Sequence, residues 1–388
     1  MMKINKKFYI IFLMFLTIVI SVKGQSDFMK NIKIKGQLSA WLSPDPANSF
    51  QTFTVIRYIP ELSAKKELSK KVSIDAEISL NTFGSAFIHS FDNTDFDGNI
   101  KPYRMWIRLS TKQFELRAGL QKINFGSATL LRPLMWFDKI DPRDPLQLTD
   151  GVYALLARYY FQNNTNVWLW ALYGNSGTKG WEMIPSFNDK VEYGGRFQTP
   201  VLTGELALTY HHRKADLSKI NVQEPLSSTD VLNENRIALD GKWDIGIGLW
   251  FELSLTHQDF DISHLYYRKA INLGADYTFA LGNGLNVMTE FFTYGVSEEV
   301  FSSSENIFFS TLSLNYPLGI VDNISTMVYY DWTNKDWYRF INWQRTYDNW
   351  SFYLMGFWNP DKFQIYNNQQ DYSFFTGTGV QFMVVFNH

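Results

Sequence analysis

One charged segment near the middle of the chain has residue types and spacing that could do chemistry. Between Lys122 and Asp150, arginine and aspartate side chains occur close together in a stretch that also contains apolar patches and three prolines. Guanidinium and carboxylate groups of this kind can hold the charged parts of a small solute or narrow a passage for ions. The candidate residues of this segment are Arg132, Asp138, Asp141, Arg143 and Asp144.

Histidine and aspartate residues form a second group, near position 260. His257, Asp259, Asp261 and His264 lie at the end of one predicted strand, where they could supply a general acid and a general base. Catalysis requires hydrogen-bond geometry that spacing alone does not establish, and solvated loop residues are the interpretation that we favour. The chain has no His-Glu-x-x-His sequence, no phosphate-binding glycine loop and no Gly-x-Ser-x-Gly element. We therefore expect no enzyme, no metal site and no cofactor.

Composition excludes several classes of protein. The 388 residues include 36 basic and 38 acidic side chains, and a net charge of -2 gives no positive field for a nucleic acid. The 13 Trp, 21 Tyr and 32 Phe provide far more apolar surface than a disordered chain carries. Cysteine is absent, which excludes disulfides and thiolate metal sites. A mean hydropathy of -0.20 argues against a bundle of membrane-spanning helices.

The N-terminus has the features of an export signal. Lys3, Lys6 and Lys7 precede an apolar run over residues 8–20, and small or short residues follow at the positions that a signal peptidase requires. We expect a signal peptide over residues 1–24 and a mature chain over 25–388. An uncleaved membrane anchor is the alternative.

The mature chain alternates between apolar and polar residues with period two. From Val72 to Leu80, valine, isoleucine, alanine and leucine alternate with serine, aspartate and glutamate, which gives one strand an apolar face and a polar face. The pattern recurs in about 18 segments of roughly 9 to 13 residues, the length that crosses a bilayer as a tilted strand. An aromatic-rich β-sandwich is the alternative.

Short and long connections alternate along the chain. This order is typical of an antiparallel up-and-down barrel, with short periplasmic turns, long external loops and both termini on the periplasmic side. Thr82 to Ile100 is one of the expected long loops. Two connections break the order: Pro60 to Lys70 is long where a turn is expected, and Asn334 to Asp336 is short where a loop is expected. We predict an all-β transmembrane barrel of about 18 strands, with 16 as the alternative.

Aromatic residues gather at the ends of the predicted strands, where the interface girdles of a membrane barrel lie. The last segment also resembles the C-terminal signal of outer-membrane barrels, with Gly379, Phe382, Val384 and Phe386 at matching positions. Two residues follow Phe386, although the signal usually ends on an aromatic residue. The resemblance implies insertion by the outer-membrane machinery.

The polar faces of the predicted strands would enclose a water-filled lumen, because charged side chains are costly on the lipid face. Arg104, Arg108, Arg117 and Arg158 lie on these faces in neighbouring segments, with Glu115 among them. We expect this basic strip to favour anions. The alternative is that each charge forms an interior ion pair that only fills and stiffens the barrel.

The stretch from Arg117 to Asp144 contains the most distinctive pattern. Arg117-Ala118-Gly119-Leu120-Gln121 ends a strand, the pair Phe125-Gly126 follows, and Asp141-Pro142-Arg143-Asp144 comes later. This order resembles a motif of porin-like outer-membrane barrel families of Gram-negative, Bacteroidota-like bacteria, in which a tryptophan is commoner where Phe125 stands. The resemblance implies a porin-like barrel. Residues 123–150 form the longest loop, and its apolar patches need a surface, so we expect it either to fold into the lumen or to cap the rim.

The sequence thus predicts an outer-membrane channel through which small polar or charged solutes diffuse. Expected partners are outer-membrane lipid, small solutes and the insertion machinery, with further copies of the chain in an oligomer as an open alternative. A closed barrel with a structural or assembly role in the envelope is the second hypothesis. A hydrolase at the barrel rim, built on His257, is the third.

Overall fold

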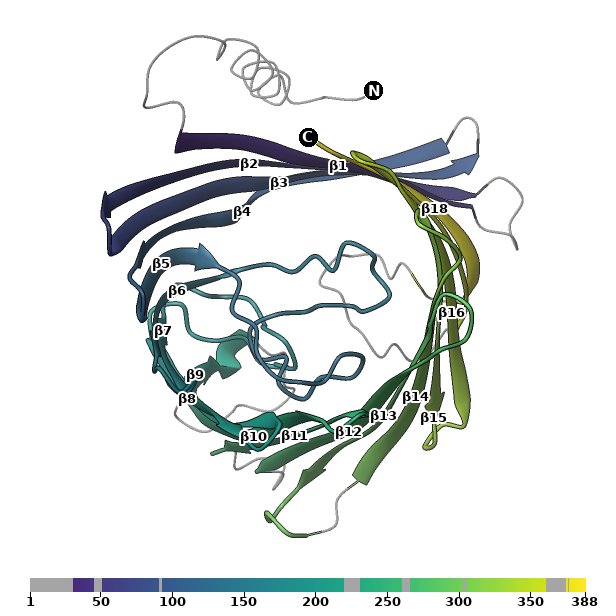
Figure 1. Ribbon diagram of the computed structural model, residues 1–388. Coiled ribbons are helices and arrows are strands. Elements are labelled where there is room, and N and C mark those ends of the chain that lie inside the picture. Colours follow the sequence, from purple (N-terminus) through teal and green to yellow (C-terminus); the bar gives the residue numbers. More distant parts are fainter. Residues whose placement is uncertain are drawn as a thin grey trace.

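A computed structural model of the protein describes residues 31–44, 51–90, 93–219, 231–259, 266–302, 305–360, 375 and 377–388. These residues form one closed barrel of eighteen antiparallel strands (Figure 1), in which consecutive strands pair and β1 also pairs with β18. The strands are β1 (Ile32–Pro44), β2 (Thr52–Ser69), β3 (Val72–Ser90), β4 (Asn93–Ser110), β5 (Phe114–Gln121), β6 (Val152–Tyr160), β7 (Asn166–Leu172), β8 (Glu192–Val201), β9 (Gly204–Asp216), β10 (Val231–Asp244), β11 (Gly248–Gln258), β12 (Tyr267–Phe279), β13 (Leu285–Ser297), β14 (Glu305–Pro317), β15 (Asp322–Asp331), β16 (Asp336–Thr346), β17 (Trp350–Trp358) and β18 (Thr378–Asn387). The prediction of an up-and-down barrel of about 18 strands is confirmed, and the alternative of 16 is wrong.

The closing pair brings the two ends of the barrel sequence together. Gly36 and His388 exchange two backbone hydrogen bonds of 3.0 Å, so the start of β1 lies beside the end of β18. An even number of strands requires this arrangement. The predicted signal peptide over residues 1–24 lies outside the described residues, and among the described residues no helix is long and apolar enough to cross a membrane.

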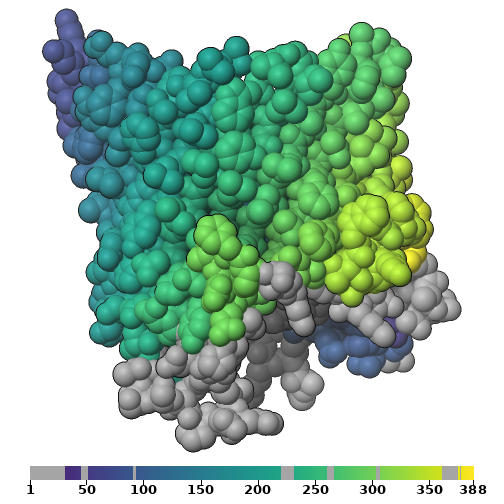
Figure 2. Space-filling model, turned by 90° about the horizontal axis from the view of Figure 1, so that it is seen from below, coloured from purple at the N-terminus to yellow at the C-terminus, as the bar shows by residue number. Residues whose placement is uncertain are grey.

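The two faces of each strand differ as the period-two pattern predicts. Apolar side chains point outward and are exposed, as in Ile56 on β2 (59%), Ile78 on β3 (53%) and Phe382 on β18 (49%). The adjacent residues Arg57 and Ser79 point inward and are only 2% and 3% exposed. Figure 2 shows the outer face of the teal, green and yellow strands as a continuous surface. Because apolar side chains cover this face, it is suited to the hydrocarbon region of a membrane rather than to water.

Two segments that were expected to be connections are strand. Residues 60–69 belong to β2, and residues 82–90 and 93–100 belong to a long hairpin in which β3 and β4 pair up to Ser90 and Asn93. Their lysine, aspartate and glycine residues are typical of loops. A strand that continues beyond the bilayer needs no apolar face, so backbone pairing with its neighbour is enough to hold it.

The wall is uneven in height. β3 and β4 have 19 and 18 residues, whereas β5, β6 and β7 have only 8, 9 and 7. Gly119 near the end of β5 has a φ of 118°, and a Cβ there would collide with the carbonyl oxygen of Met105. The buried amide of Gln121 donates hydrogen bonds to the carbonyl oxygens of Ala154 and Arg117, at 2.9 and 3.2 Å. The chain then leaves the wall and enters the barrel (Figure 1).

Candidate functional site

Residues 122–151, called here the inserted loop, lie inside the ring of strands (Figure 1). One carboxylate of the wall holds the loop by its backbone. Glu290 on β13 accepts hydrogen bonds from three successive N–H groups, those of Thr129, Leu130 and Leu131, at 2.7 to 3.2 Å. Asn272 on β12 adds a bond of 2.7 Å to the carbonyl oxygen of Leu131. The loop is therefore fixed to the β12–β13 side of the lumen.

A second wall carboxylate supports the loop in the same way. Glu252 on β11 accepts hydrogen bonds from the N–H groups of Ala128 and Leu134, at 2.7 and 3.1 Å. Gly126 has a φ of 100°, and a Cβ there would collide with the Glu252 carboxylate. The glycine of the Phe125-Gly126 pair thus permits close approach of the loop to its anchor.

Apolar side chains of the loop pack against the inner wall of the barrel in two clusters. Phe125 stacks on Trp170 of β7, with ring centroids 5.6 Å apart, and Trp136 and Phe137 join this cluster. Leu131 packs into a second cluster with rings of β13 to β16. The apolar patches of the loop therefore have the surface that their composition requires.

The connection between β7 and β8 also turns inward and interlocks with the inserted loop. Trp181 donates an indole hydrogen bond of 2.7 Å to the carbonyl oxygen of Arg132 and stacks on Phe292 of β13, with centroids 5.9 Å apart. Gly180 adopts a φ of 46°, and a Cβ there would meet the carbonyl oxygen of Met135. The alternation of short and long connections in the sequence predicts one of the long external loops at residues 175–189. In the sequence, the Gly180-Trp181 pair is a local sign of this packing.

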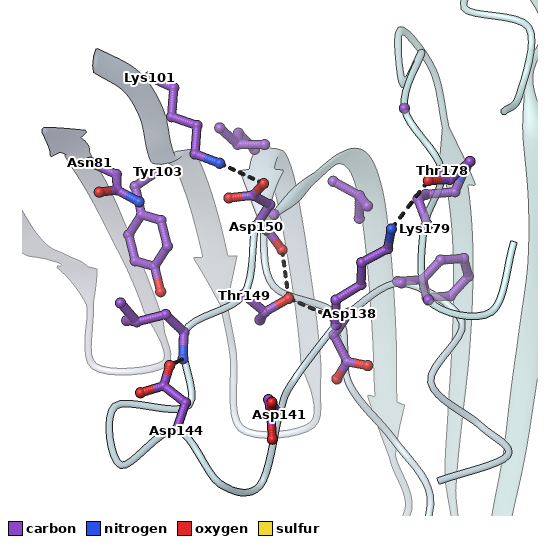
Figure 3. A pocket seen from close by; sticks show the side chains of 18 of the residues that line it. Asn81, Lys101, Tyr103, Asp138, Asp141, Asp144, Thr149, Asp150, Thr178 and Lys179 are labelled. Carbon is purple, nitrogen blue, oxygen red and sulfur yellow. Dashed lines mark hydrogen bonds and ion pairs between the residues drawn. The ribbon is translucent and has the colours of Figure 1, made fainter. Parts of the chain in front are cut away.

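A cavity of about 520 Å³ remains between the inserted loop and the wall of β1 to β4, β17 and β18 (Figure 3). Arg57, Asn81 and Tyr103 line it from the wall, and aspartates line it from the loop. Lys101 of β4 and Asp150 of the loop form an ion pair of 2.7 Å across one edge, shown as a dashed line in Figure 3. The cavity is thus polar on both sides.

Burial changes the acidity of several groups on the inserted loop. Burial raises the pKa of Asp144 to about 6, although its carboxylate accepts hydrogen bonds from the N–H groups of Leu146 and Leu148. Burial also raises the pKa of Asp138, against the opposing charge of Arg132. The charge of the cavity therefore depends on pH near neutrality.

Of the ten residues proposed as lumen or constriction candidates, five belong to the inserted loop. Two ion pairs stabilise the loop itself, since Arg132 contacts Asp138 at 3.1 Å and Arg143 contacts Asp141 at 2.8 Å. Asp138, Asp141 and Asp144 also line the cavity, whereas the two arginines are occupied by these pairs. The loop therefore presents chiefly carboxylates to the open space.

Three of the four arginines of the predicted basic strip converge on one carboxylate. Arg108, Arg117 and Arg158 lie 3.4, 3.0 and 3.8 Å from the oxygens of Glu115. Arg108 also forms a bidentate pair with Asp75, with a closest approach of 2.7 Å. The positive charge of the strip is therefore largely compensated on the wall near the short turn between β4 and β5.

Arg104, the fourth arginine of the strip, has a different environment. Its guanidinium is buried and donates a hydrogen bond of 3.0 Å to the carbonyl oxygen of Thr149. The guanidinium also lies 3.9 Å from the centre of the Tyr103 ring. Arg104 thus ties the end of the inserted loop to β4.

Further buried charges fill the side of the lumen away from the cavity. Glu234 of β10 is paired with Arg213 of β9 and Arg268 of β12 at 2.6 Å each, and Arg236 contacts Glu182 at 2.8 Å. Sequence reasoning missed Arg213, Glu234 and Glu182 as lumen residues. Arg213 of β9 and Glu234 of β10 are directly opposite each other in the register of the two strands. The sequence does not reveal this register, because the length of the connection between the two strands cannot be read from it.

The histidine group shows little organisation in its described part. The ring Nδ1 of His257 lies 3.6 Å from Asp259, which exceeds hydrogen-bond distance, and the two side chains are 37% and 56% exposed. Asp261 and His264 lie outside the described residues. Within the part of the chain that the structure describes, no group of three or more His, Asp or Glu residues is arranged to hold a metal ion.

Comparison with known proteins identifies the fold. No protein-family model and no curated protein match the sequence. Among solved structures, OccK5 (OpdH) of Pseudomonas aeruginosa matches with a TM-score of 0.56 and 12% identity over 94% of this chain and 99% of that one. OccAB4 of Acinetobacter baumannii matches with a TM-score of 0.54 and 9% identity over 92% of this chain and 98% of that one. OmpT, an outer membrane protein of Vibrio cholerae solved in a trimer form, matches with a TM-score of 0.52 and 10% identity over 92% of this chain and 98% of that one. The chain therefore has the fold of Gram-negative outer-membrane barrels.

Proposed function

We propose that this protein is an outer-membrane channel through which small polar or charged solutes diffuse. The observation that carries the proposal is the polar cavity of about 520 Å³ that the inserted loop leaves beside the wall of β1 to β4. Charged side chains of the loop and of the wall, among them Asp144, Arg57 and Lys101, line this space together. A lined aqueous constriction is the arrangement by which barrels of this size select solutes.

The selectivity of this channel would arise at the inserted loop rather than at the predicted basic strip. Glu115 and Asp75 compensate the strip, whereas the cavity presents Asp138 and Asp144 opposite the β2 side of the wall. Because groups of both signs line the cavity, we expect a modest preference between anions and cations rather than strong exclusion of either.

The same proposal covers the partners of the barrel. Phe382 on β18 points outward into the lipid region while Met383 is buried, as a C-terminal signal for the insertion machinery requires. We propose no catalytic function, because the exposed His257 and Asp259 lack hydrogen-bond geometry. A structural role without conduction remains the competing function, and the experiment below separates the two.

Single-channel conductance in planar bilayers tests the proposal, and the absence of native cysteine permits a clean design. Ser176 is exposed and lines the cavity, so a Ser176→Cys barrel should lose much of its conductance when a bulky methanethiosulfonate reagent attaches. Thr203→Cys, at the exposed turn between β8 and β9, is the matched control and should conduct unchanged. A folded barrel that passes no current before modification would contradict the proposal.

A further inference from the structure

Arg57 is a buried cation whose hydrogen-bonding capacity is incompletely used. Its side chain lies on β2, is 2% exposed, and lines the cavity. The Cζ atom of its guanidinium lies 4.9 Å from the centre of the Trp41 ring and 5.3 Å from the centre of the Phe83 ring, so two aromatic side chains position the group. Within the described ranges, Nε and one terminal nitrogen, Nη2, have no hydrogen-bond partner. Two N–H donors on one side of the guanidinium therefore have no acceptor among the described residues, which leaves them for a ligand that enters the cavity.

A buried carboxylate on the inserted loop, that of Asp138, has an oxygen to which no described residue donates a hydrogen bond. Asp138 is 2% exposed and lines the same cavity. Its Oδ2 accepts a hydrogen bond of 3.1 Å from Arg132, but Oδ1 has no partner in the part of the chain that the structure describes. The amide Oδ1 of Asn81, on the wall strand β3, is also buried and lacks a partner there. The cavity thus offers two acceptors for N–H donors.

Buried polar atoms without hydrogen-bond partners are costly, so a ligand that supplies partners to both Arg57 and Asp138 gains more than one that supplies a partner to either alone. A carboxylate suits the fork of Arg57, because guanidinium and carboxylate form bidentate pairs. An ammonium group suits the free Oδ1 of Asp138. The remaining lining includes apolar surface from Met355 and Phe375, against which a short side chain can lie.

The numbers of positive and negative side chains that line the cavity also favour a solute that carries both charges. Four basic and four acidic side chains line the cavity: Arg57, Lys101, Lys139, Lys179, Asp138, Asp141, Asp144 and Asp150. A solute with net charge meets as many repelling groups as attracting ones there. A solute that carries one charge of each sign, and no net charge, can place both in favourable positions.

We propose that the cavity binds zwitterionic solutes of the amino-acid type during passage, with the carboxylate at Arg57 and the ammonium at Asp138. This inference rests on the proposed channel function. The volume of about 520 Å³ accommodates a single amino acid together with water.

Interruption of single-channel current measures this binding directly. The probes are L-glutamine, glutaramate, which lacks the α-ammonium group, and 4-aminobutanamide, which lacks the α-carboxylate. We expect L-glutamine to interrupt the current at concentrations about tenfold lower than either analogue, because each analogue leaves the buried polar atoms of one group without a hydrogen-bond partner. Equal interruption by glutaramate would overturn the inference in favour of a simple anion site, and no interruption by any probe would indicate that only water and ions occupy the cavity.

Two variants assign the groups. Arg57→Met should make L-glutamine no better than 4-aminobutanamide, and Asp138→Asn should make it no better than glutaramate. Arg57→Lys, which retains the charge without the fork, should restore part of the difference. Arg345→Met and Asp189→Asn change exposed charges outside the cavity and should leave the block by L-glutamine intact.

The same recordings distinguish the two proposals. Steady ionic current in each variant shows that the barrel has folded and conducts. If current persists but L-glutamine has no advantage over its analogues in the unmodified protein, the binding inference fails and the channel function stands. If the unmodified barrel is silent, the channel function itself fails.

Discussion

Glu290 on β13 accepts a hydrogen bond of 2.7 Å from the backbone N–H of Leu131, although 159 positions separate the two residues in the chain. The same carboxylate receives two more backbone N–H groups, so it completes the hydrogen bonding of a turn of chain that has no secondary structure of its own. The position of the cavity therefore depends on a wall residue that does not line it.

Replacing this carboxylate should loosen the inserted loop. Glu290→Ala leaves three backbone N–H groups, two of them on buried residues, without their acceptor, and we expect a loss of about 2 to 4 kcal/mol in the free energy of unfolding together with noisier, larger single-channel currents. Urea unfolding in lipid vesicles and bilayer recordings measure the two effects. Glu205→Ala, at an exposed position near the β8–β9 turn, is the control. Unchanged current noise in Glu290→Ala would show that the loop stays fixed without the anchor.

The titration of Asp144 should change ion selectivity near pH 6. Its pKa is raised to about 6 by burial, so the carboxyl group is neutral below that pH and adds a negative charge to the cavity above it. The ratio of cation to anion permeability, measured as the reversal potential in a salt gradient, should therefore rise between about pH 5 and pH 7. Asp144→Asn should remove this step.

The same shift has a consequence for stability. The folded pKa lies above the unfolded value of 3.8, so folding is favoured by the protonated form and stability is lost as the pH rises from about 4 through 6. Unfolding by urea at pH 5 and at pH 7.5 should show this loss in the unmodified chain and a smaller loss in Asp144→Asn. An identical pH dependence in both would exclude Asp144 as its source.

The ion pair between Lys101 and Asp150 should matter for selectivity more than for stability. The two side chains are 38% and 52% exposed, and exposed pairs contribute about 0 to 1 kcal/mol. Lys101→Ala removes a positive charge from the cavity edge and should raise cation permeability, whereas Asp150→Asn should lower it. Reversal potentials for the two variants that move in the same direction would contradict this assignment.

Gly119 should not tolerate a side chain. A Cβ there collides with the carbonyl oxygen of Met105 and the residue has a φ of 118°, so Gly119→Ala should reduce folding yield severely. Gly174→Ala is a matched control, because Gly174 has a φ of 80° but no atom within 4 Å of the position that an added methyl group would take. We expect the control to cost only about 1 kcal/mol. Heat-modifiable electrophoretic mobility distinguishes folded from unfolded barrel, and equal yields for the two variants would exclude the collision.

The sequence predicted the strands because lipid and lumen impose opposite demands on alternate residues. That pattern is absent where strands extend beyond the bilayer, so residues 60–69 and 82–100 resemble connections in the sequence. Candidate residues on the inserted loop were found from their density of charge. Their partners were not, since pairs such as Arg213 with Glu234 depend on strand register, and the cavity itself depends on contacts between distant segments.

The inserted loop is anchored through its backbone, and this affects which of its residues can change during evolution. Glu252 and Glu290 accept hydrogen bonds from backbone N–H groups, so most side chains at those positions of the loop are compatible with this anchoring. Proline is excluded at 128–131 and 134 because it has no backbone N–H group. Side chains that line the cavity at less buried positions of the loop, such as Lys139 and Asp150, can therefore change while these backbone anchors stay constant. New solute preferences are then accessible to evolution, or to an engineer, without redesign of the barrel.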